Sequence, residues 1–241
     1  MLNARELKVF YGVIQGLKGV DIDVYDREIV TLIGSNGAGK TSTLNGIVNL
    51  VRSSGRVSFL NDDISRSQTH QIVRRGLALV PEERRKEGIF IEEPIAMNLS
   101  VSADNSFSRW SLFGHRKAWR WAQEVIARVG VRTTGPGQTL RRLSGGNQQK
   151  VAIGKWLRGN ANVVIFDEPT KGVDVKAKTD LFQLIDGLAR EGKGVIYASG
   201  EFSELVGLCD RICVLWDGRI VAEVKGEEAR EETLLYFSTG G

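Results

Sequence analysis

The stretch of this sequence that most restricts its fold lies between an apolar run and a helical pattern near the N-terminus. Residues 29–33 (Ile-Val-Thr-Leu-Ile) are typical of a buried strand, and residues 41–48 have the pattern of a helix. The turn between them has the sequence Gly34-Ser35-Asn36-Gly37-Ala38-Gly39-Lys40-Thr41. Its glycines allow backbone N–H groups to close around an anion, and the helix N-terminus adds a positive dipole end. We therefore predict a phosphate-binding loop in an α/β fold.

The two polar residues that end this loop have separate chemical roles. Lys40 supplies a point charge for the β- and γ-phosphates of a nucleotide, and Thr41 offers its hydroxyl to Mg²⁺. A glycine-rich turn without a ligand is the alternative, but it requires all of these positions to agree by chance between a strand and a helix. A nucleotide site with Mg²⁺ is the favoured interpretation.

Two acidic residues follow a second apolar run. Residues 163–166 (Val-Val-Ile-Phe) predict a buried strand, and Asp167 and Glu168 follow directly. Ligands of open α/β sheets bind at the carboxyl ends of the strands, so both acids are expected beside the phosphate loop. Asp167 is then placed to hold Mg²⁺, and Glu168 to orient and deprotonate the attacking water. Taken alone, the pair could also be two solvated acids at the end of a strand.

Strand and helix patterns alternate along most of the remaining chain. Apolar alternation at 2–9 and 18–25 predicts an antiparallel pair before the phosphate loop. Further strands are expected at 55–60, 76–80, 195–198, 211–216 and 220–224, and helices at 68–75, 118–129 and 147–158. Another helix is expected to carry an apolar stripe at 181–188 and to stop at Gly192. This order favours a mostly parallel sheet with helices on its faces. Residues 1–82 and 159–241 are expected to form the α/β core with its antiparallel part, and residues from about 83 to 158 an inserted helical subdomain.

The composition is that of a soluble globular protein. Hydrophobic residues make up 41% and charged residues 26% of the chain, which argues against extensive disorder. No apolar run approaches the roughly 20 residues of a membrane helix, and no signal segment opens the sequence, so we expect a cytoplasmic protein. The net charge of +4 fits a nucleotide, an anionic membrane surface or nucleic acid. Cys209 and Cys213 lack companion ligands and are expected to be reduced core thiols.

A third motif lies between the two nucleotide motifs, with the sequence Leu143-Ser144-Gly145-Gly146-Asn147-Gln148-Gln149. Taken alone, it is a serine N-cap with a glycine turn. The order of phosphate loop, Leu-Ser-Gly-Gly-x-Gln and apolar strand with Asp-Glu-Pro resembles ATP-binding-cassette (ABC) ATPases over nearly the whole chain. The resemblance implies the P-loop NTPase fold of ABC type and a head-to-tail dimer with two ATP molecules between the cassettes. Each ATP would be held by one chain's phosphate loop and by the helix N-terminus at the other chain's Ser144–Gly146.

The resemblance also implies roles for single residues. Tyr11 matches the aromatic residue that stacks on adenine, with a core aromatic as the alternative, and Asp174 lies in the loop that communicates across the dimer. The implied nucleotide-binding residues are Tyr11, Gly34, Ser35, Asn36, Gly37, Ala38, Gly39, Lys40, Thr41, Ser42, Ser144, Gly145, Gly146 and Asp174. The implied catalytic residues are Lys40 and Glu168, and the implied Mg²⁺ residues are Thr41, Asp167 and Glu82.

Two positions depart from the ABC pattern. Glu82 stands where the family has a glutamine, and Gly200 stands where it has a histidine that arranges the γ-phosphate and the attacking water. Neither His70 nor His115 is placed to substitute for that histidine. ATP binding is still expected, but hydrolysis is expected to be slow. A histidine at position 200 should raise the rate unless Gly200 holds a positive φ angle.

The resemblance differs between the two parts of the chain. Residues from about 84 on resemble the second cassette of ribose- and galactose-type sugar importers. Residues 1 to about 82 resemble branched-chain amino-acid importer cassettes. The two resemblances meet near Glu82, as in a chain of hybrid origin.

Together these resemblances imply the ATP-binding and ATP-hydrolysing subunit of an ABC importer, with a sugar as the expected solute. The alternatives are a branched-chain amino-acid importer ATPase and a regulatory cassette that binds ATP with little hydrolysis. ATP and Mg²⁺ are the implied cofactors. The implied partners are a second cassette, in a homodimer or a heterodimer, transmembrane permease subunits and, indirectly, a solute-binding protein, at the cytoplasmic face of the plasma membrane.

A soluble ABC ATPase acting on DNA or the ribosome is a different class of function. The net charge and the run Arg84-Arg85-Lys86 would suit it. However, DNA-repair members need long coiled-coil arms between the motifs, and translation-type members carry two cassettes in one chain. We therefore expect no nucleic-acid partner.

Overall fold

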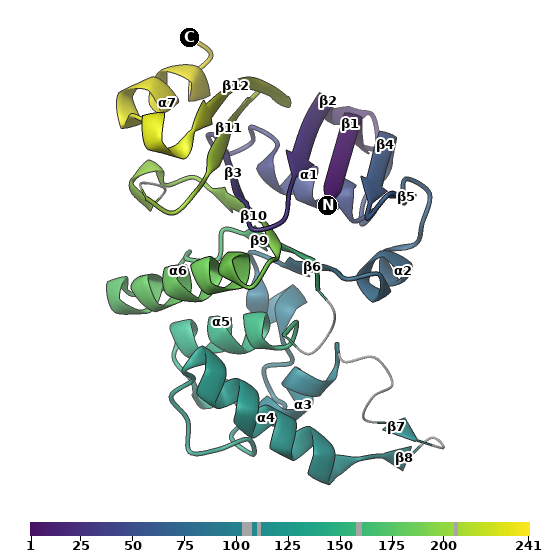
Figure 1. Ribbon diagram of the computed structural model, residues 1–241, viewed down its shortest axis with the longest axis vertical. Coiled ribbons are helices and arrows are strands. Elements are labelled where there is room, and N and C mark those ends of the chain that lie inside the picture. Colours follow the sequence, from purple (N-terminus) through teal and green to yellow (C-terminus); the bar gives the residue numbers. More distant parts are fainter. Residues whose placement is uncertain (103–107, 110–111, 158–160, 205–206) are drawn as a thin grey trace. The chain divides into compact units, whose positions relative to one another are not determined.

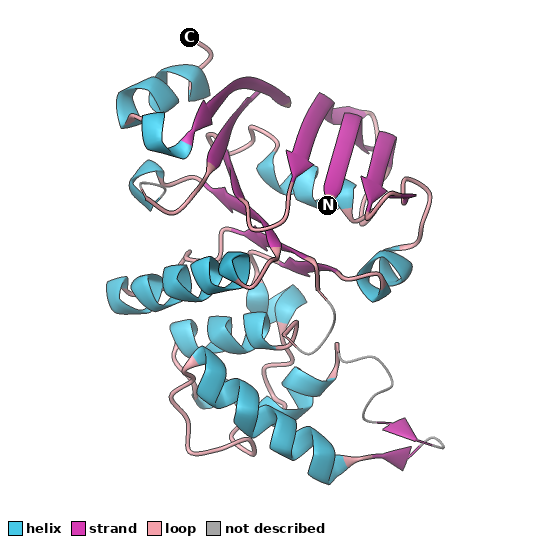
Figure 2. Cartoon of the chain, in the orientation of Figure 1, coloured by secondary structure: helices cyan, strands magenta, loops and turns pink. Residues whose placement is uncertain are grey.

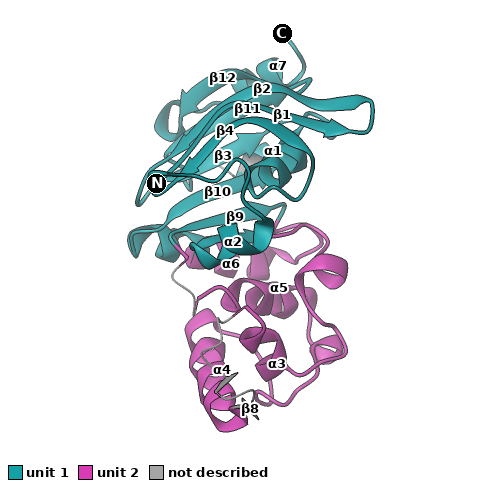
Figure 3. Cartoon of the chain, turned by 90° about the vertical axis from the view of Figure 1, so that its right-hand side faces the viewer, with its two compact units in different colours: residues 1–79, 162–168, 185–241 teal, residues 80–161, 169–184 magenta. Residues whose placement is uncertain are grey.

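The computed structural model describes residues 1–102, 108–109, 112–157, 161–204 and 207–241. These residues form two compact units (Figure 3). The first unit comprises residues 1–79, 162–168 and 185–241, and the second comprises residues 80–161 and 169–184. The boundary expected at residues 158 and 159 falls outside the described residues.

The first unit contains a four-stranded antiparallel sheet in the order β2-β1-β4-β5. Its strands are β1 (Leu2–Tyr11), β2 (Ile14–Val24), β4 (Ser53–Phe59) and β5 (Asp62–Asp63) (Figure 1). The alternation of buried side chains along β1 breaks at Glu6, whose φ is 49°, and the register against β2 shifts there. A bulge thus takes up one residue and keeps the apolar side chains of β1 on one face. The antiparallel pair predicted from the sequence is confirmed.

The second sheet of the first unit is mostly parallel and has the strand order β12-β11-β3-β10-β9-β6. Its strands are β3 (Ile29–Ile33), β6 (Leu77–Val80), β9 (Val163–Asp167), β10 (Gly194–Ser199), β11 (Arg211–Trp216) and β12 (Arg219–Lys225). Strand β10 runs parallel to β3 and β9, and β12 runs antiparallel to β11. Every residue of β3, β9 and β10 is buried, which explains their apolar sequences.

This strand order decides which loops meet. Because β3, β10 and β9 are parallel neighbours, their carboxyl ends lie at one edge of the sheet. Gly34 follows β3, Gly200 follows β10, and Glu168 follows β9. The sheet therefore brings the loop at Gly34 together with two loops that follow it by more than 100 residues in the sequence.

Helices cover these sheets (Figure 2). Helix α1 (Lys40–Ile47) contacts β1 and β2 of the antiparallel sheet and also β9 and β10 of the mostly parallel one. Its Leu44 and Ile47 are fully buried, so one helix joins the two sheets into one core. Helix α2 (Thr69–Arg74) precedes β6, and α7 (Glu231–Ser238) packs on β11 and β12.

Helix α6 (Val175–Arg190) begins in the second unit and ends in the first. The buried residues at its predicted apolar stripe include Leu181, Ile185 and Leu188. Two 3₁₀ turns, η4 (Phe202–Glu204) and η5 (Gly226–Glu228), complete the first unit. The two cysteines are free and buried, as expected, and burial raises the pKa of Cys213 to about 12.

The second unit is built mainly from short helices. Its elements are the π-helical turn η1 (Arg84–Gly88), α3 (Ile95–Ser100), β7 (Ser108–Arg109), β8 (Leu112–Phe113), α4 (His115–Val129), the 3₁₀ turn η3 (Leu140–Arg142) and α5 (Gly145–Gly154). Helices α3, α4 and α5 contact one another. Gly154 allows this, since a Cβ there would lie 2.7 Å from Val125 and 3.2 Å from Leu99. Helix α5 ends earlier than the predicted residue 158, which itself lies outside the described residues.

Across the ranges that the structure describes, no helix combines the length and the apolar composition needed to span a membrane.

Candidate nucleotide site

The loop Gly34–Thr41 connects β3 to α1 in the first unit, and its glycines are required by geometry. A Cβ on Gly34 would lie 2.4 Å from the carbonyl oxygen of Leu215. Gly37 and Gly39 have φ angles of 86° and 113°, which side chains rarely adopt. Gly39 is also the N-cap of α1 and offers no side-chain hydrogen bond, so the first N–H groups of the helix have no side-chain cap. The loop therefore presents backbone donors to an anion.

Lys40 is the seventh residue of this loop and the first residue of α1. Its side chain is buried, and its Nζ donates a hydrogen bond of 2.8 Å to the carbonyl oxygen of Gly34. The same Nζ lies 3.4 Å from Oε1 of Glu168. The sheet thus places the predicted phosphate-binding lysine and the predicted base side by side. A γ-phosphate held by Lys40 would lie within reach of Glu168.

Glu168 has an unusual backbone conformation. It follows β9 with a φ of 45°, and its N–H donates to the carbonyl oxygen of Ala198 at 3.0 Å. A left-handed conformation costs a non-glycine residue about 1 kcal/mol or more, and such residues concentrate at functional sites. The strained backbone turns the Glu168 side chain toward Lys40 at the end of the sheet.

Two predicted Mg²⁺ residues belong to the same unit. Asp167 is the last residue of β9 and is buried, whereas Thr41 is exposed in the first turn of α1. No cluster of three acidic, histidine or cysteine residues able to hold a metal is found in the described part of the chain. Mg²⁺ keeps water and phosphate ligands and takes only one or two protein ligands, so Thr41 and Asp167 would suffice where a nucleotide supplies the phosphates.

Gly200 lies beside the side chains of Lys40 and Glu168. An added Cβ would lie 3.5 Å from Oε1 of Glu168 and 3.8 Å from Nζ of Lys40, which is ordinary van der Waals contact. Gly200 is exposed, and its φ lies outside the left-handed region. The positive φ considered from the sequence is therefore wrong, and a side chain at this position would point toward the site without backbone strain.

Tyr11 is exposed at the end of β1. Its side chain packs against Gly16, and its hydroxyl lies 3.2 Å from Oγ of Ser42 in α1. The alternative of a core aromatic is wrong, since 45% of the residue is exposed. An exposed ring tied to the first turn of α1 is suited to stacking on a base.

The third motif lies in the second unit. Ser144 is the N-cap of α5, and its Oγ accepts hydrogen bonds from the N–H and the Nδ2 of Asn147 at 3.5 and 2.9 Å. Gly146 is required because a Cβ would lie 2.5 Å from the Cβ of Ala177. Asp174 accepts a 3.0 Å hydrogen bond from the N–H of Ala177 and so caps the first turn of α6.

Glu82 has a cationic partner within the second unit. Its Oε1 accepts a hydrogen bond of 2.5 Å from Nζ of Lys171. A metal ion would have to compete with this ammonium for the carboxylate. Its expected place among the Mg²⁺ residues stays a prediction.

Arg84 contacts the surroundings of the third motif, although no sequence pattern had indicated it. Its Nη1 donates to the carbonyl oxygen of Lys171 at 3.3 Å, and its Nη2 lies 2.8 Å from the position of a Cβ on Gly145. Burial lowers the pKa of Arg84, as does the neighbouring Arg85. The run Arg84-Arg85-Lys86 was a visible signal, but nothing in it indicated contact with a loop about 60 residues away.

Comparisons with known proteins agree with this geometry. The profile of the family described as "ABC transporter" matches residues 17–171. The chain is 36% identical over 230 residues to the ribose import ATP-binding protein RbsA of Pseudomonas putida, covering 95% of this chain and 45% of that protein. It is 37% identical over 224 residues to the galactose/methyl galactoside import ATP-binding protein MglA of Clostridium perfringens, covering 92% and 44%. The chain thus spans less than half the length of these relatives.

Among solved structures, one neighbour is a dimeric ATP-binding cassette in a post-hydrolysis state, bound to ADP and Pi. It superposes with a TM-score of 0.81 at 22% identity, over 94% of this chain and 99% of that one. At this identity the likeness shows the fold, which is the predicted one.

Proposed function

Because the chain belongs to the ABC transporter family, we propose that it is the ATP-binding and ATP-hydrolysing subunit of an importer, coupling ATP turnover to solute uptake. The observation that carries this proposal is the contact of 3.4 Å between Lys40 and Glu168 at the open N-terminus of α1. It joins a phosphate-binding cation to a general base in one unit.

The proposed chemistry assigns one role to each group. Lys40 and the loop N–H groups bind the β- and γ-phosphates, and Tyr11 stacks on the adenine. Thr41 and Asp167 would hold Mg²⁺, which neutralises charge on the phosphate oxygens when it is bound. Glu168 accepts a proton from the attacking water and orients it in line with the γ-phosphate.

The second unit would act on the nucleotide of a neighbouring cassette. Ser144, Gly145 and Gly146 would face the γ-phosphate of an ATP held by the phosphate loop of that cassette, and Asp174 would lie close to the contact between the cassettes. Permease subunits would dock this dimer at the cytoplasmic face of the membrane. The names of the relatives favour a sugar as the solute. A branched-chain amino acid is the alternative that the first 82 residues support.

The hydrolysis step is tested by phosphate release from Mg-ATP by the purified chain. Glu168→Gln should abolish release while leaving the affinity for a fluorescent ATP analogue unchanged, because the amide keeps the shape but cannot accept the proton. The matched control is Glu227→Gln, which changes an exposed acid of η5. Equal turnover in all three proteins would refute the role of Glu168.

The solute is tested in cells that lack the gene for this chain. Uptake of labelled ribose, galactose and leucine is compared with that of the parent strain. Loss of sugar uptake alone supports the proposed solute class, and loss of leucine uptake alone supports the alternative.

A second candidate function is a regulatory cassette that binds ATP with little hydrolysis. The observation that favours it is Gly200, which leaves the space beside Glu168 and Lys40 without a side chain. Negligible wild-type phosphate release together with tight ATP binding would distinguish this function.

A further inference from the structure

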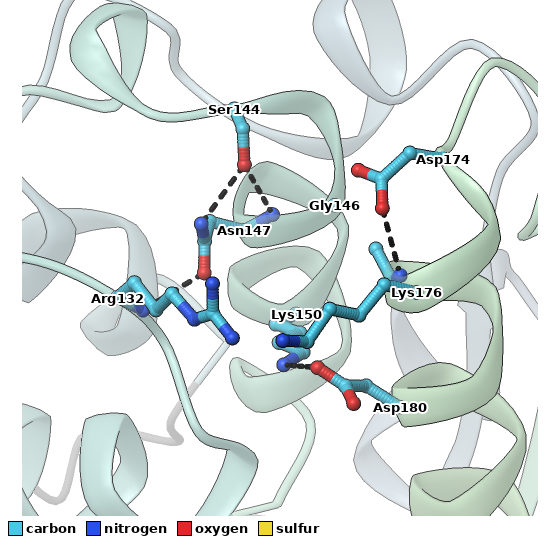
Figure 4. A pocket seen from close by; sticks show the side chains of 9 residues that line it. Arg132, Ser144, Gly146, Asn147, Lys150, Asp174, Lys176 and Asp180 are labelled. Carbon is cyan, nitrogen blue, oxygen red and sulfur yellow. Dashed lines mark hydrogen bonds and ion pairs between the residues drawn. The ribbon is translucent and has the colours of Figure 1, made fainter.

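A small pocket of the second unit lies beside the start of α5 and the first turns of α6 (Figure 4). It is lined among others by Arg132, Ser144, Asn147, Lys150, Lys176 and Asp180. Its volume of about 60 Å³ corresponds to roughly two water molecules. The pocket therefore admits a group the size of one phosphate, but not a whole nucleotide.

The charges around this pocket do not balance. Lys150 is buried and already has partners, since its Nζ donates to Oδ2 of Asp180 at 2.7 Å and to the carbonyl oxygen of Gly130 at 3.1 Å. The other acid of the lining, Asp174, has one oxygen engaged in capping α6. Arg132 and Lys176 bring two further positive charges, and both are exposed.

The side chains of Arg132 and Lys176 reach toward the middle of the pocket from opposite sides (Figure 4). Within the described residues, neither forms an ion pair with a carboxylate inside 4 Å. Both cations nevertheless act on Asp180: its pKa is lowered by Lys150 and also by Arg132 and Lys176. The pocket thus holds three cations, Arg132, Lys150 and Lys176, against two acids, Asp174 and Asp180, and this net positive charge favours an anionic ligand.

A hydrogen-bonded chain ties Arg132 to the serine of the third motif. Asn147 Oδ1 accepts from the N–H of Arg132 at 2.8 Å, and Asn147 Nδ2 donates to Oγ of Ser144 at 2.9 Å. Because Oγ accepts from α5, its own hydrogen is directed away from that helix and is available to an external acceptor. The backbone of Arg132 and the hydroxyl of Ser144 are therefore held by the same amide of Asn147.

We propose that Arg132 and Lys176 contact the phosphate chain of an ATP that is bound by the phosphate loop of a second copy of this chain. This inference rests on the proposed function, because it requires the head-to-tail dimer. A phosphate edge matches the pocket in size and charge, and a guanidinium offers it two parallel N–H donors. Ser144 contributes a hydroxyl to the same anion. Arg132 and Lys176 strengthen the ATP-dependent dimer without belonging to the phosphate loop.

The test measures the dimer rather than turnover. In a Glu168→Gln background with Mg-ATP, sedimentation velocity gives the dissociation constant of the dimer. The double variant with Arg132→Gln and Lys176→Gln should raise this dissociation constant roughly tenfold to a hundredfold, because it loses charge-assisted hydrogen bonds to the phosphates. The matched control is the pair Arg116→Gln and Arg120→Gln, which removes two exposed charges from α4 of the same unit. Affinity of each protein for a fluorescent ATP analogue is measured at protein concentrations far below the dissociation constant of the dimer, where each chain is a monomer, so that it reports the phosphate loop alone and should not change.

The outcomes separate this inference from the proposed function. A Glu168→Gln parent that binds ATP but never dimerises overturns both. A parent that dimerises, with the pocket pair unchanged or weakened no more than the α4 pair, overturns this inference alone. A dimer produced by inorganic phosphate without nucleotide, and lost in the pocket pair, would overturn ATP as the source of the anion. If the double variant fails to fold, Lys176→Gln alone is measured, since Lys176 is exposed, with the same expected direction and the same overturning result.

Discussion

Each of the two units has a helix N-terminus next to a glycine-containing motif, but the two N-termini differ in their caps and in the cations around them. In the first unit, Gly39 precedes α1 without a side-chain cap, and Lys40 folds back over the loop carbonyl of Gly34. In the second unit, Ser144 caps α5, and the cations lie to the side in the pocket of Figure 4. The first arrangement can enclose a phosphate group by itself. In the proposed dimer, the second would offer one face of a site to an ATP held by the other cassette.

The largest expected effect concerns the open space in the first unit. Gly200→His should raise phosphate release by up to about 10²–10³-fold, because preorganised contacts to a transferring phosphate commonly contribute that much. The structure places a Cβ at position 200 next to Glu168 and Lys40 without backbone strain. Gly200→Ala is the control, since it adds the Cβ without the imidazole.

The measurement is steady-state phosphate release by wild type, both Gly200 variants and Glu168→Gln. Wild-type turnover that already equals that of histidine-bearing cassettes, and that Glu168→Gln abolishes, would show the site to be complete without the histidine.

Lys40→Ala tests the claim that the first unit binds ATP by itself. Removing the ammonium should cost about 1.5–3 kcal/mol, or roughly tenfold to a hundredfold in affinity. Titration with a fluorescent ATP analogue measures this loss, with Lys8→Ala in β1 as the control lysine. Equal affinities of wild type, Lys40→Ala and Lys8→Ala for the analogue would show that the phosphate loop is not the binding site.

Each unit also contains a lysine that is shielded from solvent, and these two lysines differ in their partners. Lys40 lies beside Glu168, whereas Lys155 of the second unit has no carboxylate partner among the described residues. Lys155 Nζ donates to the carbonyl oxygen of Gly88 at 2.7 Å and lies 4.9 Å from the ring centroid of Trp156. Burial lowers the pKa of Lys155 from 10.5 to about 8.

This shift predicts a pH dependence with a definite sign. Between pH 8 and 10.5 the unfolded chain keeps the Lys155 proton and the folded chain releases it, so the free energy of unfolding should rise with pH across this window. The rise is below about 4 kcal/mol, because one pKa unit corresponds to about 1.36 kcal/mol, and solvent screening reduces it further. Urea unfolding of wild type, Lys155→Met and the exposed control Lys225→Met measures it. A rise that persists in Lys155→Met would contradict the assignment to this lysine.

The smallest effect concerns the cap that distinguishes the second unit. Ser144→Ala should destabilise the chain by about 1 kcal/mol, because the backbone N–H of Asn147 in the first turn of α5 loses its acceptor. For a chain of 241 residues this corresponds to a fall in melting temperature of about 2–4 °C. Ser54→Ala, at an exposed serine of β4, is the control. An unchanged melting temperature would show that Asn147 or solvent replaces the cap.

Local patterns in the sequence were sufficient for much of this structure. The strands β3, β9 and β10 are continuous apolar runs because both of their faces are buried. Their positions were therefore predictable from the sequence alone. The phosphate loop was visible for a similar reason. Its required glycine conformations and its lysine lie within eight consecutive residues, and each restricts the amino acid at its own position.

Tertiary structure alone decided how distant residues meet. The contact of Lys40 with Glu168 depends on the strand order β3-β10-β9, and the conformation of Gly200 depends on the loop that this order creates. The convergence of Arg132 and Lys176 likewise joins positions that carry no shared periodicity. A backbone conformation or an apolar face depends on residues that are close together in the sequence, so a local sequence pattern can predict it. A charge has no such local signature, because its energy depends on which other charges the completed fold brings near it.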